Sequence, residues 1–325
     1  MTSNNKNKNN LKIRDNKISA TVRQINTTAS SDIMQGVEAK VLLILFEKSI
    51  IPSLINNSES WTLTSAEEDQ VDRIDIRALK RLFSLPNTTP NPAVIFSFGQ
   101  LYITQEIDRR RFMFLHKVLN RENTHWTKKM MLHLKERNLG WAKNIQGKLT
   151  QYDIETDWMK IKAVTKNEWK KCVSEAVEKY NKDKLIKSCI SPGPHGIKIN
   201  TKTKHIHQQL TTTTTKQERR PSTGVTNGSK LRAKSIILSR YGMLECGNNF
   251  KGTMPQTCQT CKTVDNEYHR LNECSIYEHL NYANSLTKCN FNDVYTDDTK
   301  ILYPTISHIE NVWEFRYANG RMRKQ

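Results

Sequence analysis

The chain has 325 residues, of which 36% are hydrophobic, so it is long enough for two domains and can bury at least one core. The apolar stretch from Val41 to Leu45 is too short to span a bilayer, and the amino terminus lacks the apolar segment of a secretory signal. We therefore expect an intracellular protein, in the nucleus or the cytoplasm, with no membrane partner.

The net charge of +19 is distributed unevenly along the chain. Residues 101–262 carry thirty-two basic and thirteen acidic side chains, whereas residues 31–100 and 263–325 carry slightly more acidic than basic ones. Lysine and arginine attract phosphate backbones because binding releases the counterions condensed on a nucleic acid. The charge favours RNA or DNA as a partner, although a basic chain can also simply be soluble.

The first thirty residues are rich in Asn, Lys, Thr and Ser and contain few large apolar groups. Such a composition does not bury enough surface to offset the entropy of ordering, so residues 1–30 are predicted to form a disordered basic arm. After this arm the pattern becomes helical and predicts a helix that ends before Pro52. Its apolar stripe consists of Ile33, Val37, Val41, Ile44 and Leu45.

Two further helices are predicted before residue 121. Ser65 and Glu68 have the spacing of a capping box, which predicts a helix start, and apolar residues continue through Val71 to Leu82. A proline-rich loop follows, and then a helix from about Gln105 to Asn120. This helix has basic residues near its start, where they oppose the helix dipole, so we expect an anionic partner for Arg109, Arg110 and Arg111.

The run from Lys166 to Lys187 has the cleanest amphipathic stripe in the sequence, which predicts a helix packed against a core. The composition then changes to proline, glycine and threonine. Residues 191–229 are therefore predicted to be a low-complexity linker that follows a helical domain over residues 31–190.

Three cysteines and one histidine follow the linker in the pattern C-x2-C-x7-H-x4-C. Three thiolates and one imidazole suit a tetrahedral zinc ion and leave no open position for a catalytic water. We predict a structural zinc site with Cys258, Cys261, His269 and Cys274 as ligands. His279 is an alternative ligand. The remaining cysteines are interpreted as ordinary thiols: Cys172, Cys189, Cys246 and Cys289.

Residues 295–298 spell Y-x-D-D, the tetrapeptide that holds catalytic metal ions in reverse transcriptases. That chemistry needs the carboxylates on a hairpin between apolar strands and a further aspartate from an earlier strand. Neither is evident here, so we interpret Asp297 and Asp298 as part of a solvated acidic turn.

Three stretches resemble the carboxy-terminal part of a non-LTR retrotransposon polyprotein, beyond the polymerase palm. Residues 45–61 are similar to the segment that leads into the reverse transcriptase thumb, and residues 85–90 with 109–115 are similar to the helices that follow it. Residues 240–251 with the cysteine-histidine cluster resemble the zinc knuckle near the end of such proteins. The resemblance implies a truncated element product, with surfaces that bind nucleic acid and without the polymerase core.

We therefore expect a mainly α fold with five parts: the arm, a thumb-like helical domain, the linker, a CCHC zinc module over residues 230–280 and a helical tail over residues 281–325. The expected function is binding of RNA or DNA, with no enzymatic activity and no small-molecule substrate; Tyr268 is available for base stacking. An alternative is a zinc-stapled protein-interaction or architectural module. The expected phosphate-binding residues are Arg109, Arg110, Arg111, Arg232, Lys234, Arg240 and Lys251.

Overall fold

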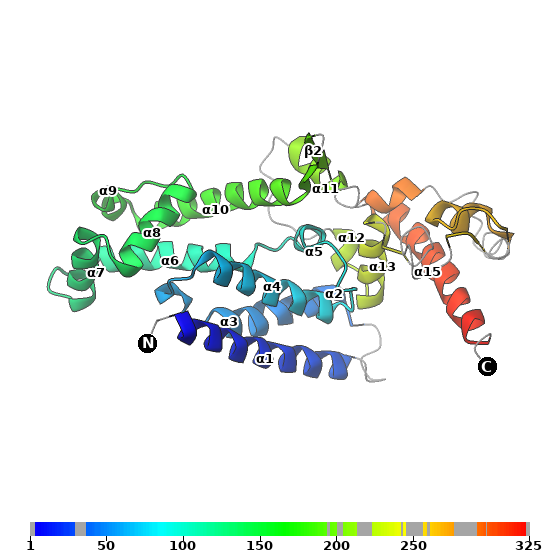
Figure 1. Ribbon diagram of the computed structural model, residues 1–325, viewed down its shortest axis with the longest axis horizontal. Coiled ribbons are helices and arrows are strands. Elements are labelled where there is room, and N and C mark those ends of the chain that lie inside the picture. Colours follow the sequence, from blue (N-terminus) through cyan, green and yellow to red (C-terminus); the bar gives the residue numbers. More distant parts are fainter. Residues whose placement is uncertain are drawn as a thin grey trace.

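Helices form almost all of the regular structure in the computed structural model, and the expectation of a mainly α fold is confirmed (Figure 1). The structure describes residues 4–29, 37–193, 196–199, 204–212, 223–241, 243–244, 256–258, 261–275, 291–296 and 298–322. Within this part of the chain, no helix combines the length and the apolar composition that a bilayer crossing needs.

The expected disordered arm is instead a helix, α1 (Asn4–Ala29), which lies along α3 (Ile51–Ile55) and α4 (Ser65–Leu82). Its few apolar residues recur at helical spacing on one face, and Leu11, Ile18 and Val22 are buried. The Arg14 guanidinium donates to the carbonyl oxygens of Ser53 (3.1 Å) and Leu54 (2.9 Å), which lie near the end of α3. Composition alone missed this helix because the spacing of its apolar residues matters more than their number.

The first predicted helix differs from the expectation in its end and in the face that it buries. Helix α2 (Ala39–Leu45) continues through a π turn, η2 (Phe46–Ile50), into α3, so Pro52 lies at the start of α3 and does not end the helix. The side chains that enter the core are Leu42, Leu43, Phe46 and Ile50, whereas Val41, Ile44 and Leu45 are exposed. Residues 41–46 are apolar on all sides, so periodicity does not determine which side faces inward.

The capping box of α4 lies one residue earlier than predicted. The Thr64 hydroxyl oxygen accepts from the Glu67 amide at 3.4 Å, and the Glu67 carboxylate accepts from the Thr64 amide at 2.8 Å. Glu68 is therefore not part of the cap. It pairs with Lys148 at 2.7 Å. The predicted pair, Ser65 and Glu68, and the observed pair, Thr64 and Glu67, have the same spacing. Only the backbone conformation at the start of the helix distinguishes them.

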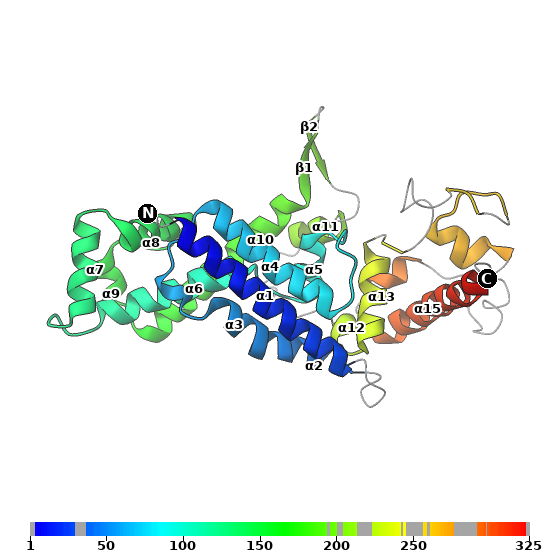
Figure 2. The ribbon, with the colours of Figure 1, turned by 60° about the horizontal axis from the view of Figure 1, so that its bottom comes forward.

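The buried apolar side chains of the described residues form two clusters, and helices α6 (Ile103–Leu119) and α10 (Lys166–Ser188) cross from one to the other. The smaller cluster contains only residues between Phe112 and Val177. The predicted stripe of α10 enters this cluster through Trp169, Val173 and Val177. Figures 1 and 2 show α6 and α10 side by side, with the helices between residues 126 and 163 at one end of an elongated molecule. The other helices of this region are α5 (Asn91–Ser97), α7 (Trp126–Glu136), α8 (Gly140–Gln151) and α9 (Trp158–Ala163).

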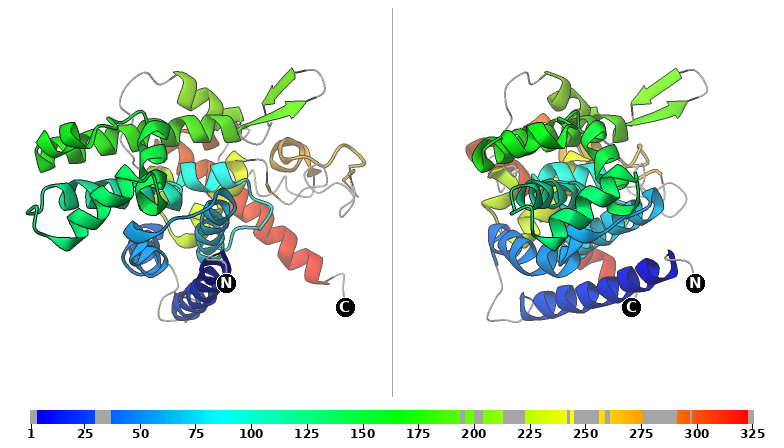
Figure 3. Two further views of the ribbon diagram at one scale, coloured as in Figure 1. Left: turned by 60° about the vertical axis from the view of Figure 1, so that its left-hand side comes forward. Right: turned by 90° about the vertical axis from the view of Figure 1, so that its left-hand side faces the viewer.

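The segment predicted as a linker contains regular structure in its described part. Strands β1 (Ile190–Gly193) and β2 (Gly196–Ile199) form an antiparallel hairpin that stands off from the helices (Figures 2 and 3). Helices α11 (Lys204–Thr212) and α12 (Thr223–Thr226) follow, and Ile206, Leu210 and Val225 are buried in the larger cluster. Three apolar residues spread over twenty positions are too sparse to give a periodic signal. Residues 194–195, 200–203 and 213–222 of this segment lie outside the described residues.

The carboxy-terminal elements share the larger cluster with the amino-terminal helices. Helix α13 (Lys230–Arg240) contributes Ile236 and Ile237, and α15 (Thr299–Met322) contributes Leu302 and Ile306. Two short helical turns, η5 (His269–Glu273) and η7 (Phe291–Tyr295), contact α15. The cysteine-histidine region is therefore joined to the same core as α1–α5.

Asp75 on α4 is a buried carboxyl whose Oδ1 atom has no hydrogen-bond partner among the described residues. Burial, and secondarily the Asp72 carboxylate, raise the pKa of Asp75 well above its ordinary value. A raised pKa in the folded state means that folding favours the protonated form. This contribution to stability is fully present below the unfolded-state pKa of about 3.9 and is lost as the pH rises through the folded-state pKa.

We therefore expect Asp75→Asn to raise the free energy of unfolding at neutral pH and to leave it nearly unchanged near pH 4. Urea denaturation of both proteins across this pH range measures the difference, and effects of other titrating groups cancel in it. A variant that is less stable than the wild type at pH 7 would contradict the prediction.

Candidate metal centre and basic groove

A tight turn brings Cys258 and Cys261 to one point. The Lys262 amide donates to the Cys258 carbonyl oxygen at 2.9 Å, and the Cys258 amide donates to the Thr263 carbonyl oxygen at 2.8 Å. Lys262 lies at the end of this turn and has a left-handed backbone conformation, with φ of 61°. Directly after it, the Asn266 side chain accepts from the His269 amide at 2.8 Å, which fixes the start of the helical turn η5 that carries the histidine.

The four predicted ligands lie together. Their ligand atoms are all within 4.8 Å of one another. Cys274 Sγ lies 3.8 Å from Cys258 Sγ and 3.8 Å from Cys261 Sγ. A tetrahedron with metal–sulfur bonds of about 2.3 Å has edges of about 3.8 Å, so these two sulfur–sulfur distances match those of a tetrahedral metal site. The cluster can hold a metal ion. His279, the alternative ligand, lies outside the described residues.

The surroundings of the cluster suit a closed site. His269 and Cys274 are buried, and Cys258 and Cys261 are half-buried. The Thr263 hydroxyl lies 3.0 Å from His269 Nδ1, and partners of this kind fix the orientation of a ligand ring. Hydrogen bonding with Ser275 lowers the pKa of the Cys261 thiol, which favours the thiolate that binds metal.

The metal centre is attached to the rest of the fold. Leu271 and Cys274 belong to the larger hydrophobic cluster, and His308 on α15 lies with its Nε2 atom 3.3 Å from the Leu271 carbonyl oxygen. A buried ion pair between Arg270 and Asp265 joins η5 to the segment that precedes it. A metal ion bound at this cluster would therefore stabilise the contact between η5 and α15 as well as its own loop.

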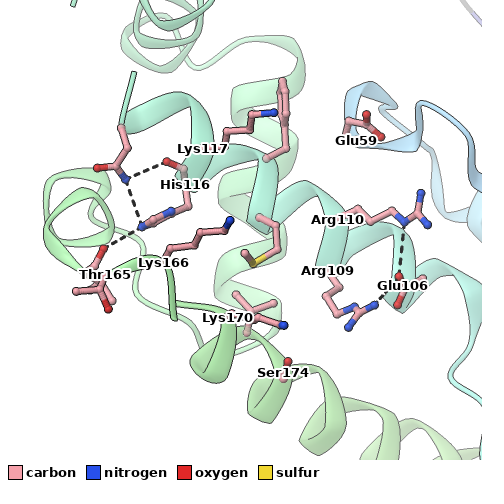
Figure 4. A pocket seen from close by; sticks show the side chains of 15 residues that line it. Glu59, Glu106, Arg109, Arg110, His116, Lys117, Thr165, Lys166, Lys170 and Ser174 are labelled. Atoms are coloured by element: carbon pink, nitrogen blue, oxygen red, sulfur yellow. Dashed lines mark hydrogen bonds and ion pairs between the residues drawn. The ribbon is translucent and has the colours of Figure 1, made fainter. Parts of the chain in front are cut away.

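The second candidate site is a groove of about 1010 Å³ between α6 and α10, called the basic groove below. Five of its lining residues are basic and two, Glu59 and Glu106, are acidic. Arg109 and Arg110 share one partner, Glu106, at 2.7 and 3.5 Å, so this group of three keeps a net positive charge. Figure 4 shows them on α6 with lysines of α10 nearby. The five basic residues of the basic groove are Arg109, Arg110, Lys117, Lys166 and Lys170.

Two of the predicted phosphate-binding arginines are internal instead. Arg111 is 1% exposed, pairs with Asp108 at 3.1 Å and donates to the Trp61 carbonyl oxygen. Arg240 is buried and donates to the carbonyl oxygens of Val294 (2.6 Å) and Thr296 (2.8 Å). Both therefore stabilise the fold and are not available to a phosphate.

The remaining predicted phosphate-binding residues are placed away from the basic groove or are not described. Arg232 stacks over the Tyr303 ring, and Lys234 is half-buried on the same helix, α13. Lys251 lies outside the described residues, whereas Tyr268 is exposed beside the metal ligands.

No protein-family model, curated protein or solved structure matches this chain. The site residues therefore have to be interpreted from their own geometry.

The Y-x-D-D segment has helical and not hairpin structure in its described part. Tyr295 ends the helical turn η7. Asp298 is exposed and caps α15, because its Oδ1 atom accepts from the Lys300 amide at 3.0 Å. Asp297 lies outside the described residues.

Sequence reasoning missed three lysines of the basic groove. Lys117 follows Arg110 by seven residues on α6, and Lys166 and Lys170 are four residues apart on α10. Both spacings place the side chains on one helical face. This periodicity of charged residues was the signal that could have found them.

Proposed function

We propose that the chain binds RNA or DNA through the basic groove and that it has no enzymatic activity. The observation that carries this proposal is the convergence of five basic side chains from two helices on one hollow, with only two carboxylates among them. Lysine and arginine contacts to phosphates supply most of the affinity of a binder without sequence preference. The concentration of basic residues in segment 101–262 supports the same conclusion.

We further propose that the ion of the cysteine-histidine cluster is zinc with a structural role. Three thiolates and one imidazole form a closed ligand set, which zinc prefers among the common metal ions. The resemblance to the carboxy-terminal part of a retrotransposon reverse transcriptase agrees with a nucleic-acid-binding fragment that carries a zinc knuckle. The alternative, a protein-interaction or architectural module, predicts binding that depends little on salt.

The test is the salt dependence of oligonucleotide binding by the full chain. The logarithm of affinity should fall linearly with the logarithm of salt concentration, with a slope of about 0.7 to 0.9 for each phosphate contact. The variant Arg109→Gln/Arg110→Gln/Lys166→Gln/Lys170→Gln should reduce that slope by about two to four units. Fluorescence anisotropy at several salt concentrations measures both slopes.

The control variant removes the same number of charges from a different surface. Lys12, Lys17, Arg23 and Lys40 are exposed on α1 and α2, and their combined change to glutamine should leave the slope almost unaltered. Equal effects of the two variants would indicate that net charge, and not the basic groove, determines binding. Affinity that does not change with salt would refute the proposal and favour the protein-interaction alternative. Nucleotide incorporation in the presence of magnesium ions would refute the absence of enzymatic activity.

A further inference from the structure

The basic groove has an apolar floor between its cationic sides. Met113 and Phe114 lie on α6 between Arg110 and Lys117, and both are half-buried. Val173 on α10 closes the floor from the other helix and is buried. A site that bound only phosphate would gain nothing from these side chains, because a phosphate is fully solvated and has no apolar surface.

The aromatic ring in the floor is held in a fixed orientation. Phe114 lies edge-to-face with Trp141 of α8, with centroids 5.9 Å apart and an interplanar angle of 84°. The Trp141 indole in turn donates to the Glu59 carbonyl oxygen at 2.8 Å. Glu59 itself lines the basic groove, on the side of Arg110 (Figure 4). A ring supported in this way can offer a surface to a ligand with little loss of entropy.

We propose that the basic groove selects single-stranded nucleic acid, with the backbone along the lysines and arginines and unstacked bases against Met113 and Phe114. This inference rests on the proposed function and specifies its ligand. Single strands can turn their bases outward onto apolar and aromatic side chains, whereas a duplex keeps its bases stacked and paired inside. A volume of about 1010 Å³ is comparable to that of large small-ligand sites, so the basic groove has room for a few unstacked bases.

The Ser174 hydroxyl can satisfy the polar edge of such a base. Ser174 lines the basic groove on the α10 side, together with Lys166 and Lys170 (Figure 4). The Thr165 hydroxyl and the Asn120 amide also line the groove but are bonded within the fold, to Glu168 and to His116. An acidic protein segment would match the cationic sides equally well, but it offers a flat ring only where its sequence contains an aromatic residue, whereas every nucleotide carries one. The cationic sides and the apolar floor of the basic groove together therefore favour a single-stranded nucleic acid as the ligand.

The experiment compares single-stranded and double-stranded oligonucleotides of about 15 nucleotides, within the range of site sizes of single-strand-binding modules, by fluorescence anisotropy with the full chain. We expect the single strand to bind at least about tenfold more tightly than the duplex of the same length. Phe114→Leu keeps the apolar volume but removes the aromatic face. It should weaken single-strand binding about tenfold without changing the salt slope, since base stacking contributes that much per base.

Trp126→Leu is the matched control, because Trp126 on α7 is 70% exposed and does not line the basic groove. It should leave the affinity unchanged, and circular dichroism of each variant should match the wild type. Equal, salt-dependent binding of both oligonucleotides would overturn the single-strand inference and leave the proposed function intact. Binding of neither would overturn the proposed function. Competition by polyglutamate as strong as by the single strand, together with no effect of Phe114→Leu, would assign the groove to acidic protein segments instead.

Discussion

Removal of the metal ion is expected to unfold the cysteine-histidine module and to release α15 from it. Structural zinc sites contribute about 10–16 kcal/mol to the folding of small zinc modules, which exceeds the total stability of many domains. Because Leu271 and Cys274 lie in the larger hydrophobic cluster and Leu271 contacts His308, the loss should extend to the packing of α13 and α15. The purified full chain should contain about one equivalent of zinc by elemental analysis.

A chelator should then lower the helical signal in circular dichroism and open the region after α13 to proteolysis. Cys274→Ser should behave as the chelated protein does. Cys172→Ser should behave as the wild type, because Cys172 is exposed on α10, away from the cluster. Less than about half an equivalent of zinc after reconstitution, or a spectrum that the chelator does not change, would contradict the metal site.

Arg111→Met should lower the free energy of unfolding by up to about 3–5 kcal/mol, the cost of leaving one partner of a buried ion pair alone, reduced by the charge of Lys148, which stays near Asp108. The Asp108 carboxylate would remain in the interior, where it also accepts from the Tyr152 hydroxyl at 3.0 Å and lies 3.4 Å from Lys148 Nζ. Burial, and secondarily Asp108, raise the pKa of Tyr152, which keeps its hydroxyl group protonated as a donor. Denaturation by urea measures the loss.

Arg110→Met is the matched control on the same helix. Arg110 is 38% exposed, so its removal should change stability by less than about 0.5 kcal/mol and should instead weaken oligonucleotide binding. Suppose that Arg111→Met kept the stability of the wild type but no longer bound the oligonucleotide. The assignment of Arg111 to the interior and of Arg110 to the binding surface would then be wrong.

The grouping of the four candidate metal ligands could be predicted because four strong ligands in a fixed order are rarely a coincidence. The arginine triplet could not be resolved in the same way. Consecutive residues on a helix point about 100° apart, so three adjacent arginines never share one face, and only tertiary packing decided that Arg111 turns inward.

The helices of the fold could be predicted where apolar residues recur every three or four positions among polar ones. The start of α10 at Lys166 follows from its stripe and from the threonine before it. Composition did not predict helix α1, although the spacing of Leu11, Ile18 and Val22 indicates a helix. The order of this segment also depends on partners that come later in the chain, such as Ser53 and Arg77, and a local window does not contain those contacts.

The division of the interior into two clusters has a consequence for the order of folding during synthesis. The smaller cluster is built from one uninterrupted stretch of about sixty-five residues, so its contacts are local and can form as soon as that stretch leaves the ribosome. The larger cluster joins Leu11 to Val312 and remains incomplete until the end of the chain is available. Until then α1–α5 expose apolar surface that α13 and α15 later cover, and exposed surface of this kind makes an incompletely folded chain prone to aggregate.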